Sequence, residues 1–361
     1  MDELKENRAK LEEIDARMAA LFEERMKVSE NIADYKRANS LPVMDEERER
    51  ELIAKNSALV DDPTCREYYV LFQKQLMKLS RDCQTRIISG RRVAYCGTEG
   101  AFAYLAAKKQ FPEASPVGYS DFAGAYTAVE QGICDCAVLP IENSSAGDIG
   151  TVMDLMFSGS LYVNSIVELE VVQNLLGQPG APASGIRTVV SHPQALEQCE
   201  EYIRARGLQT VSYSNTALAA QYVKGLGDPT VAAIASEETA QLFGLEILDR
   251  GINNAHVNTT RFVVLSRSQH MPEPSGGKES EHFILMFTVR NEAGALAQPL
   301  NIIGAHNFNM RNLHSRPMKG LLWNYYFFVE AEGNIATQNG KDMLTELSAV
   351  CARLKLAGTY R

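Results

Sequence analysis

The sequence predicts a multidomain protein in which an all-helical segment precedes a layered α/β domain and a small C-terminal α/β domain. All 25 glycines lie from Gly90 onward. Strand-like and helical runs alternate after Arg92, and the polar, proline- and glycine-containing stretch Ser266–His282 precedes a final βαββαβ pattern. Because glycine destabilises helix interiors and favours turns, its absence from residues 1–89 indicates helices. The alternation that follows indicates layered α/β folds.

Length and charge limit the classes of function. The 361 residues allow two or three domains. A formal net charge of −9 and a pI near 5.3 argue against general binding of nucleic acid or anionic membranes, which requires a basic surface. No apolar run is long enough to span a bilayer. Seven irregularly spaced cysteines and an acidic N-terminus favour a cytoplasmic protein with reduced thiols.

Pro42 and Pro63 divide the N-terminal segment into helices expected near 3–39, 44–58 and 62–88. The first helix carries an apolar seam with steps of mostly three and four residues, as a packed helix requires. Its members are Leu4, Leu11, Ile14, Met18, Leu21, Val28, Ile32 and Tyr35.

Arg8 and Arg25 fall on this apolar seam. A buried guanidinium is costly without an anion, so the pattern indicates either an ion pair with a neighbouring helix or a site for an anionic ligand. Seventeen residues separate the two arginines, which is about 25 Å along one helix. One small ligand therefore cannot contact both arginines of the same straight helix, whereas Arg8 of one chain can approach Arg25 of another if the two helices pair antiparallel. A helix of about 37 residues is also too long for its two short partners to cover. Both arguments favour a dimer of antiparallel helices that shares its sites.

Further polar residues complete a recognisable pattern in this segment. Asp45 suits a helix N-cap, and Ser80 and Gln84 are spaced to share one helix face. Each residue alone would be typical of a cap or a solvated surface. Over about residues 1–90, the chain closely resembles the all-helical chorismate mutases, through Arg8, Arg25, Lys36, Asp45, Arg48, Glu49, Ser80 and Gln84.

The resemblance implies an intertwined helical dimer that rearranges chorismate to prephenate. This reaction is unimolecular, so the protein needs clamps for two carboxylates and donors at the ether oxygen rather than a nucleophile. The resemblance implies that Arg8 of the partner subunit, Arg25 and Arg48 bind carboxylate or ring oxygens. Lys36 and Gln84 would be catalytic at the ether oxygen. The substrate hydroxyl would be held by Glu49, with support from Asp45 and Ser80.

The central segment lacks a dinucleotide-binding fingerprint but carries polar clusters where strands end. The loop Cys96–Phe102 has two glycines and no third. Ligands of open α/β sheets bind at the carboxyl ends of strands, and free N–H groups at helix N-termini make carboxylate sites. The polar clusters are Pro140–Gly147, Ser191–Ala195 with Gln198, Ser214–Ala217 and Asn258–Phe262.

These clusters contain the elements IEN…G, SHPQAL and TRF, in the order found in prephenate dehydratases, which the chain resembles over roughly residues 92–268. The resemblance implies a two-lobed, periplasmic-binding-protein-like α/β domain with prephenate in its cleft. It also implies expulsion of the ring hydroxyl and ring carboxylate as water and CO₂, which leaves phenylpyruvate. Thr260 would donate to the leaving hydroxyl, although His192 would be the better acid on chemical grounds and is interpreted as a positioning residue. The other substrate-binding residues would be Asn143, Ser191, Gln198, Thr216 and Arg261.

The C-terminal segment, residues 283–361, resembles an ACT regulatory domain and follows a linker at 269–282. Its expected elements are Phe283–Val289, Ala293–Ala305, Met310–Pro317, Trp323–Glu330, Lys341–Leu354 and a last short strand. The resemblance implies a phenylalanine site between paired domains, formed by Gly294, Ala295, Leu296, Ser315, Arg316 and Pro317. His314 stands where the family pattern more often has Glu. A purely structural dimerisation module is the alternative.

Together the three resemblances predict a bifunctional enzyme of phenylalanine biosynthesis, a homodimer or a higher homo-oligomer, inhibited by L-phenylalanine. Neither reaction requires a cofactor, and Cys134 and Cys136 have no nearby His or Cys partner that would indicate a metal site. Two alternatives remain open. The mutase segment could serve only for dimerisation, or the chain could be a non-catalytic amino-acid sensor.

Overall fold

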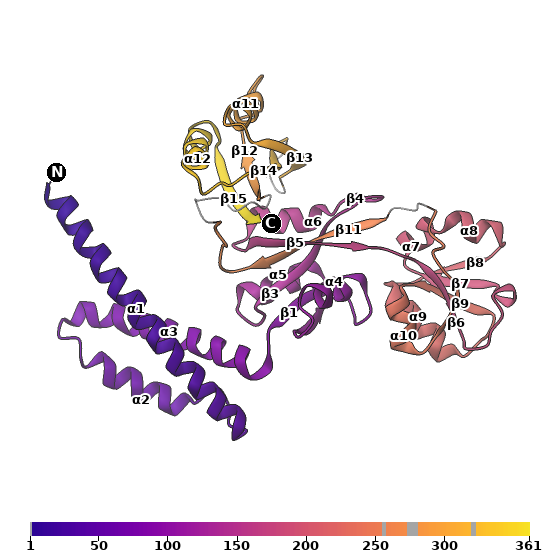
Figure 1. Ribbon diagram of the computed structural model, residues 1–361, viewed down its shortest axis with the longest axis horizontal. Helices are drawn as coiled ribbons and strands as arrows, with labels where there is room; N and C mark the ends of the chain where they lie inside the picture. Colours follow the sequence, from indigo (N-terminus) through magenta and orange to yellow (C-terminus); the bar gives the residue numbers. More distant parts are fainter. Residues whose placement is uncertain (1, 255–257, 273–280, 319–322) are drawn as a thin grey trace. The chain divides into compact units, whose positions relative to one another are not determined.

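The computed structural model describes residues 2–254, 258–272, 281–318 and 323–361. It divides the chain into two compact units, Met1–Arg92 and Val93–Arg361. Figure 1 shows a helical N-terminal unit and a mixed α/β C-terminal unit. Among the described residues, no helix combines the length and the apolar character that crossing a membrane requires.

The N-terminal unit consists of α1 (Asp2–Ala38), α2 (Glu46–Ser57) and α3 (Pro63–Ser89). Side chains set the starts of the two shorter helices. The carboxylate of Asp45 accepts a hydrogen bond from the Arg48 N–H at the start of α2, and Asp62 accepts one from the Cys65 N–H at the start of α3. Both α1 and α2 contact α3.

The apolar seam of α1 is largely exposed within this unit. All eight of its members are exposed, from Ile32 at 44% to Tyr35 at 64%. In the half of α1 that contacts α3, the buried residues are instead Ser29 and Ala33. Arg25 lies between the exposed seam and the residues that face α3, because its guanidinium donates to Ser80 while Leu21 and Val28, one turn away on either side, are exposed.

The C-terminal unit contains two sheets. The larger sheet has the order β13-β14-β12-β15-β5-β11-β3-β1-β2, with β4 paired to β3. Its first-lobe strands are β1 (Arg92–Cys96), β2 (Ser115–Tyr119), β3 (Cys136–Asn143), β4 (Gly147–Asp148), β5 (Tyr162–Glu170) and β11 (Thr259–Ser266). The helices of this lobe are α4 (Phe102–Gln110), α5 (Phe122–Glu130) and α6 (Gly150–Ser158).

The smaller sheet, with the order β10-β6-β9-β7-β8, forms a second lobe (Figure 1). Its strands are β6 (Asn174–Gly177), β7 (Thr188–Ser191), β8 (Gln209–Ser212), β9 (Val231–Ala235) and β10 (Glu246–Asp249). Its helices are η1 (Ala183–Gly185), α7 (Pro193–Gln198), α8 (Glu200–Ala205), α9 (Thr216–Leu226) and α10 (Glu237–Phe243). The chain enters this lobe after β5 and leaves it before β11, so the lobe is an insertion between two neighbouring strands of the larger sheet.

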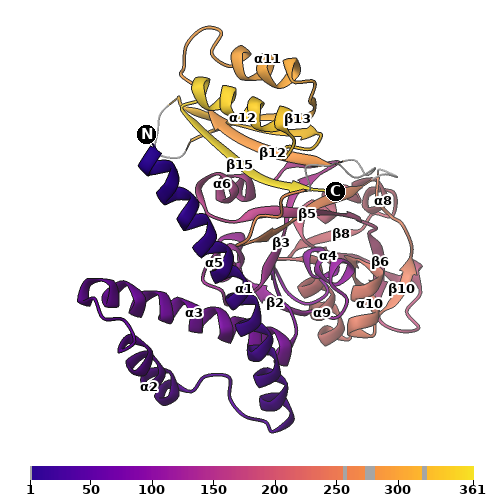
Figure 2. The same ribbon diagram turned by 60° about the vertical axis from the view of Figure 1, so that its left-hand side comes forward.

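The C-terminal elements follow the order βαββαβ. They are β12 (His282–Thr288), α11 (Ala297–Ala305), β13 (Asn309–Pro317), β14 (Tyr325–Glu332), α12 (Gln338–Val350) and β15 (Arg353–Tyr360). Figure 2 shows α11 and α12 on one face of this sheet and α6 on the other. A single bridge, Gly358 with Val163, joins β15 to β5. A Cβ at Gly358 would lie 2.0 Å from the Val163 carbonyl oxygen, so this approach requires glycine.

Three sequence-based boundaries in this region are corrected. The helix expected from residue 293 begins at Ala297, because Gly294 adopts φ +80° in the preceding turn. The helix expected to reach residue 354 ends at Val350, and Arg353 already belongs to β15. The strand expected from Trp323 begins at Tyr325, and Trp323 itself has φ +59°. Most of the predicted linker, residues 273–280, lies outside the described residues.

Candidate active sites

The interface between α1 and α3 brings together four of the residues predicted to bind chorismate. The Arg25 guanidinium donates to the hydroxyl of Ser80. The Lys36 ammonium donates to Gln84 Oε1 at 3.2 Å, and Gln84 Nε2 donates to Ser29 Oγ at 3.1 Å. Ser80 and Gln84 are each 7% exposed. The i, i+4 spacing of these two residues therefore places both on the face of α3 that meets α1.

This interface is electropositive. Among the described residues, neither Arg25 nor Lys36 has a carboxylate within ion-pair distance, and their printed partners are the neutral groups of Ser80, Gln84 and the Val43 carbonyl. Burial lowers the pKa of Arg25 from its usual value. Two cations held against neutral donors and acceptors are typical of a site that an anion completes.

The remaining predicted chorismate-binding residues lie elsewhere in the helical unit. Glu49 on α2 forms an ion pair with Arg81 on α3. Arg48 is exposed, and its guanidinium lies 3.7 Å from Glu51. Asp45 is the N-cap of α2, and Arg8 is exposed near the start of α1. The sequence pattern did not indicate Ser29 and Arg81 as site residues. Ser29 could have been found because it lies one helical turn after Arg25.

The second candidate site is a cavity of about 700 Å³ between the two lobes of the C-terminal unit. Among the described residues, its lining contains no Asp, Glu, Lys or Arg. Polar groups from both lobes face it, among them Thr98, Asn143, Gln173, Gln198, Thr216 and Thr260. The cavity therefore offers hydrogen bonds and no charged side chain.

Helix N-termini supply the cavity with positive potential. Four helices of nine to eleven residues begin at its wall: α4 at Phe102, α5 at Phe122, α6 after Ile149 and α9 after Asn215. The first N–H groups of a helix have no intrahelical partner, and the helix dipole places partial positive charge there. A carboxylate is stabilised at such positions without a cationic side chain.

Thr260 and Asn143 form a hydrogen-bonded pair in the cavity wall. The Asn143 Oδ1 accepts from the backbone N–H groups of Ser145 and Ala146, at 3.0 and 2.9 Å, so this atom must be the amide oxygen. Asn143 Nδ2 therefore donates to Thr260 Oγ1 at 2.9 Å and to Asn258 Oδ1 at 2.8 Å. Because Thr260 Oγ1 already accepts, its own hydroxyl hydrogen is available to a ligand.

The structure places three other predicted residues at the cavity. Gln198 and Thr216 line it, and Gln198 Oε1 lies 3.4 Å from Gln173 Nε2. His192 lines it as the N-cap of α7, where Nδ1 accepts from the Gln194 N–H at 3.3 Å. Burial lowers the pKa of His192 below its usual value, so the imidazole is neutral at pH 7.

Two predicted prephenate-binding residues do not line the cavity. Ser191 is completely buried, and its hydroxyl donates to the Ile234 carbonyl at 2.6 Å, between β7 and β9. Arg261 extends from β11 on the face opposite Thr260, since successive side chains of a strand alternate. The prediction of a substrate contact for Arg261 is corrected, because its guanidinium binds Glu142 and Glu330 instead.

Two cavity residues that the sequence pattern did not indicate carry buried polar atoms without a hydrogen-bond partner. Gln173 is 2% exposed, and its Oε1 has no hydrogen-bond partner. Thr98 Oγ1 is likewise buried without a partner. Gln173 follows β5 in the segment that crosses between the lobes, and its position after a strand end was the available signal. Thr98 belongs to the loop that was rejected as a dinucleotide site.

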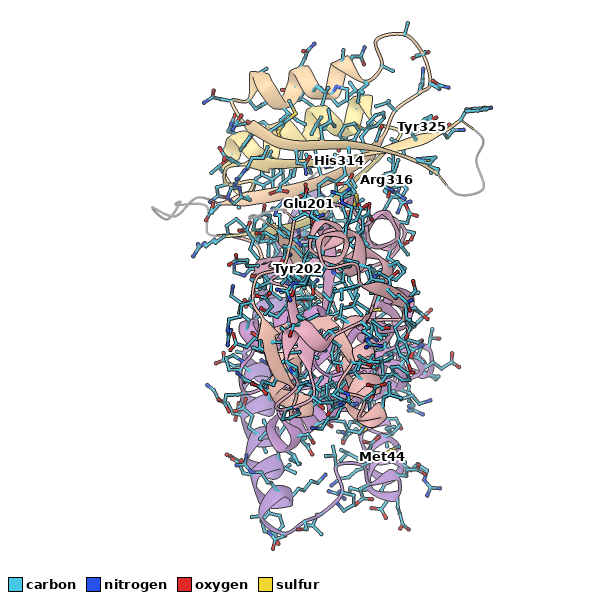
Figure 3. The ribbon with its side chains drawn as sticks, turned by 90° about the vertical axis from the view of Figure 1, so that its right-hand side faces the viewer. Met44, Glu201, Tyr202, His314, Arg316 and Tyr325 are labelled. Atoms are coloured by element: carbon cyan, nitrogen blue, oxygen red, sulfur yellow. The ribbon has the colours of Figure 1, made fainter. Side chains whose placement is uncertain are left out.

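The segments predicted to bind phenylalanine lie at the surface of the C-terminal sheet. Gly294 is exposed in the turn before α11, and Ser315 and Pro317 are exposed on the edge strand β13. Arg316 instead contacts the first lobe, where Nε lies 3.2 Å from Asp154 Oδ1. Figure 3 shows Arg316 and His314 on the same side of the C-terminal sheet.

His314 belongs to a small charged cluster with Asp148 and Glu142. Its Nδ1 lies 2.6 Å from Asp148 Oδ2, and ligand-type atoms of all three residues lie within 4.8 Å of one another. Glu142 also binds Arg261 at 3.2 Å, so a cation here would compete with that guanidinium. The cluster is a polar side-chain contact between β13 and β4.

The geometry is that of a class of enzyme that acts on anionic small molecules at two separate sites. One site lies on helices with unpaired cations, and the other is a neutral cavity between α/β lobes. A family model for chorismate mutase type II matches residues 7–85, and one for prephenate dehydratase matches residues 93–270. A bifunctional chorismate mutase/prephenate dehydratase from Enterobacter agglomerans is 31% identical over 98% of this chain and 94% of its own length. The chain belongs to the bifunctional chorismate mutase/prephenate dehydratase family.

Solved structures resemble the C-terminal unit. One described as GqqA, a novel type of quorum quenching acylase, is 32% identical with a TM-score of 0.69, over 75% of this chain and 97% of its own. Prephenate dehydratase from Arthrobacter aurescens in complex with L-Phe is 24% identical with a TM-score of 0.68, over 74% of this chain and 89% of its own. The second likeness concerns the fold alone.

Proposed function

We propose that the two sites act in sequence: the helical unit converts chorismate to prephenate, and the interlobe cavity converts prephenate to phenylpyruvate. The observation that carries the second step is the Thr260 hydroxyl, which Asn143 orients so that its hydrogen is free to donate into a cavity without charged side chains. The full chain incubated with chorismate should release prephenate and then phenylpyruvate. Chorismate consumption without phenylpyruvate would contradict the assignment of the cavity.

In the dehydratase step, the bond between the ring and its carboxylate breaks, and CO₂ leaves. The electron pair of that bond completes the aromatic ring as the ring hydroxyl departs. Thr260 donates its hydrogen to this hydroxyl, which leaves as water, and solvent restores the threonine hydroxyl. Each turnover consumes one proton. The helix N-termini of α4, α5, α6 and α9 hold the carboxylates.

The proposal gives His192 a positioning role, because its imidazole is neutral and caps α7. Asn is a comparably good N-cap, so we expect His192→Asn to keep the dehydratase kcat within about fivefold, since loss of a general acid would cost at least about 100-fold. Because burial holds the pKa of His192 below its usual value, raising the pH from 7 to 8 should remove no proton from this imidazole and should leave the dehydratase rate without a step from His192. A hundredfold loss in this variant would transfer the proton-donor role from Thr260 to His192.

The mutase site is proposed to form between two copies of the chain. Its support is the exposed seam of the 37-residue helix α1, which a second α1 would cover, with Arg8 of the partner subunit completing the site beside Arg25 and Lys36. Phenylalanine binding at the segments Gly294–Leu296 and Ser315–Pro317 of an ACT-type domain is proposed on the sequence resemblance. L-Phe added to the full chain should lower the dehydratase rate.

A charge placed on the apolar seam of α1 should weaken the pairing of α1 with the α1 helix of a second subunit. We expect Leu21→Glu to reduce mutase activity at least about tenfold at low protein concentration, because an unpaired charge on a paired apolar surface opposes association. Activity should recover partly as protein concentration rises, while dehydratase activity stays unchanged. The control is Glu23→Gln, which lies off the seam and pairs with Lys27 at 3.0 Å. A site shared between two subunits would be excluded if the mutase activity of Leu21→Glu did not depend on protein concentration and equalled that of the control.

A further inference from the structure

Arg261 stands next to Thr260 in the sequence, yet its side chain lies on the opposite face of β11. There it donates hydrogen bonds to residues of three strands, and Glu168 of a fourth strand, β5, lies 3.7 Å from its Nε. The guanidinium forms a two-pronged contact with Glu330 of β14, with Nη2 to Oε1 at 2.7 Å and Nη1 to Oε2 at 3.0 Å. Nη1 also donates to Glu142 at 3.2 Å, and Nη2 donates to the Tyr360 hydroxyl at 3.3 Å.

Glu330 is the buried member of this group, with only 2% of its surface exposed. Burial alone would raise the pKa of Glu330. Hydrogen bonds from Arg261 and Tyr360, and the charge of Arg261, nevertheless hold that pKa below its usual value. The carboxylate is therefore ionised in the interior, where its charge is tolerable only while Arg261 stays in place. The contact fixes β11 to the C-terminal sheet.

Strand β3, which neighbours β11, likewise places one residue on the cavity face of the sheet and the next residue on the Arg261 face. In the β3–β11 ladder, Thr260 is opposite Asn143, and Arg261 is opposite Glu142. Each of the two hydrogen-bonded cavity residues is thus flanked by a residue of the Arg261 group on the other face of the sheet. A shift of one strand relative to the other would change the 2.9 Å contact between Asn143 and Thr260 and the 3.2 Å contact between Glu142 and Arg261 together.

We propose that Arg261 and Glu330 are positioning residues of the dehydratase: the buried contact with the C-terminal domain holds the ends of β3 and β11 so that Asn143 orients the Thr260 hydroxyl. The proposal rests on the assignment of the interlobe cavity as the dehydratase site. It makes the C-terminal domain part of the catalytic geometry. Neither residue touches the substrate, so the effect belongs in kcat rather than in KM.

The test compares Glu330→Gln with Glu332→Gln in the full chain. Glu332 lies two residues further along β14, on the same face, but it is 44% exposed in its side chain and pairs with Arg311 at 3.6 Å. We expect Glu330→Gln to lower the dehydratase kcat at least about tenfold with KM within about threefold. Glu332→Gln should change neither constant. The melting temperature and circular dichroism of the same preparations report whether the C-terminal unit is folded, and mutase activity reports on the N-terminal unit.

Two further variants separate positioning from folding. Arg261→Lys keeps the charge but cannot form the two-pronged contact, so its kcat should also fall, with mutase activity retained, even if Glu330→Gln does not fold. The double variant Arg261→Gln/Glu330→Gln leaves no lone buried charge at this pair and should lose no more kcat than Arg261→Gln alone, because both act through one contact.

Two results would overturn the proposal. In the first, Glu330→Gln or Arg261→Lys retains the parental dehydratase kcat while its melting temperature falls, which would reduce the contact to a structural one. In the second, losses from the two single substitutions multiply in the double variant. Failure of the underlying assignment looks different, because the parental chain itself would then produce no phenylpyruvate from prephenate.

Discussion

Replacing Thr260 with Ala is expected to lower the dehydratase kcat by about 10²–10³-fold, the usual cost of removing one preorganised donor at a site of developing charge. The reason is specific to the geometry. Asn143 Nδ2 donates to Thr260 Oγ1, so the threonine hydrogen is directed away from Asn143, and in the alanine variant no other group takes its place at that position. The measurement is phenylpyruvate release from saturating prephenate.

The same preparation should rearrange chorismate at the parental rate, because the helical site lies in the other compact unit. Thr260→Ser keeps the hydroxyl and should retain most of the dehydratase rate. A non-catalytic sensor would show no dehydratase activity in the parental chain. Equal activity of the Ala and Ser variants would exclude Thr260 as the donor.

Patterns along the sequence were sufficient to predict the order and type of the N-terminal helices and of the C-terminal βαββαβ elements. The absence of glycine before Gly90 indicated three helices, and the structure has three. The first residue of a helix or strand was less predictable where a single residue before it turns the backbone. Gly294 and Trp323 adopt positive φ, and each delays the next element by two to four residues relative to the pattern. Such turns depend on backbone conformation, which the hydrophobic pattern does not record.

The sequence predicted which residues gather at each candidate site, but not on which face of the sheet each side chain lies. Thr260 and Arg261 belong to one motif, and the sequence assigned both to the substrate. Strand alternation separates them, so that one faces the cavity and the other faces Glu330. The resemblance to prephenate dehydratases led to the choice of Thr260 rather than His192 as the proton donor, since a neutral hydroxyl is not an obvious acid. Only coordinates show the amide orientation of Asn143 that makes the threonine hydrogen available.

Replacing Lys36 with Ala is the complementary experiment, and we expect mutase activity to fall by about 10²–10³-fold. In the rearrangement, negative charge develops on the ether oxygen as its C–O bond breaks. Lys36 donates to Gln84 Oε1 and to the Val43 carbonyl, and no carboxylate among the described residues neutralises Lys36. Its charge is therefore available to the transition state, and removing it should affect kcat more than KM.

The matched control is Lys27→Ala on the same helix, where the ammonium is exposed and pairs with Glu23. An exposed pair of this kind contributes little to stability, so both activities should remain at parental values. Dehydratase activity of Lys36→Ala should also be unchanged. Parental chorismate turnover by Lys36→Ala would mean that the cations of the helical unit are idle and that this unit serves for association alone, leaving the interlobe cavity as the one catalytic site supported by the described residues.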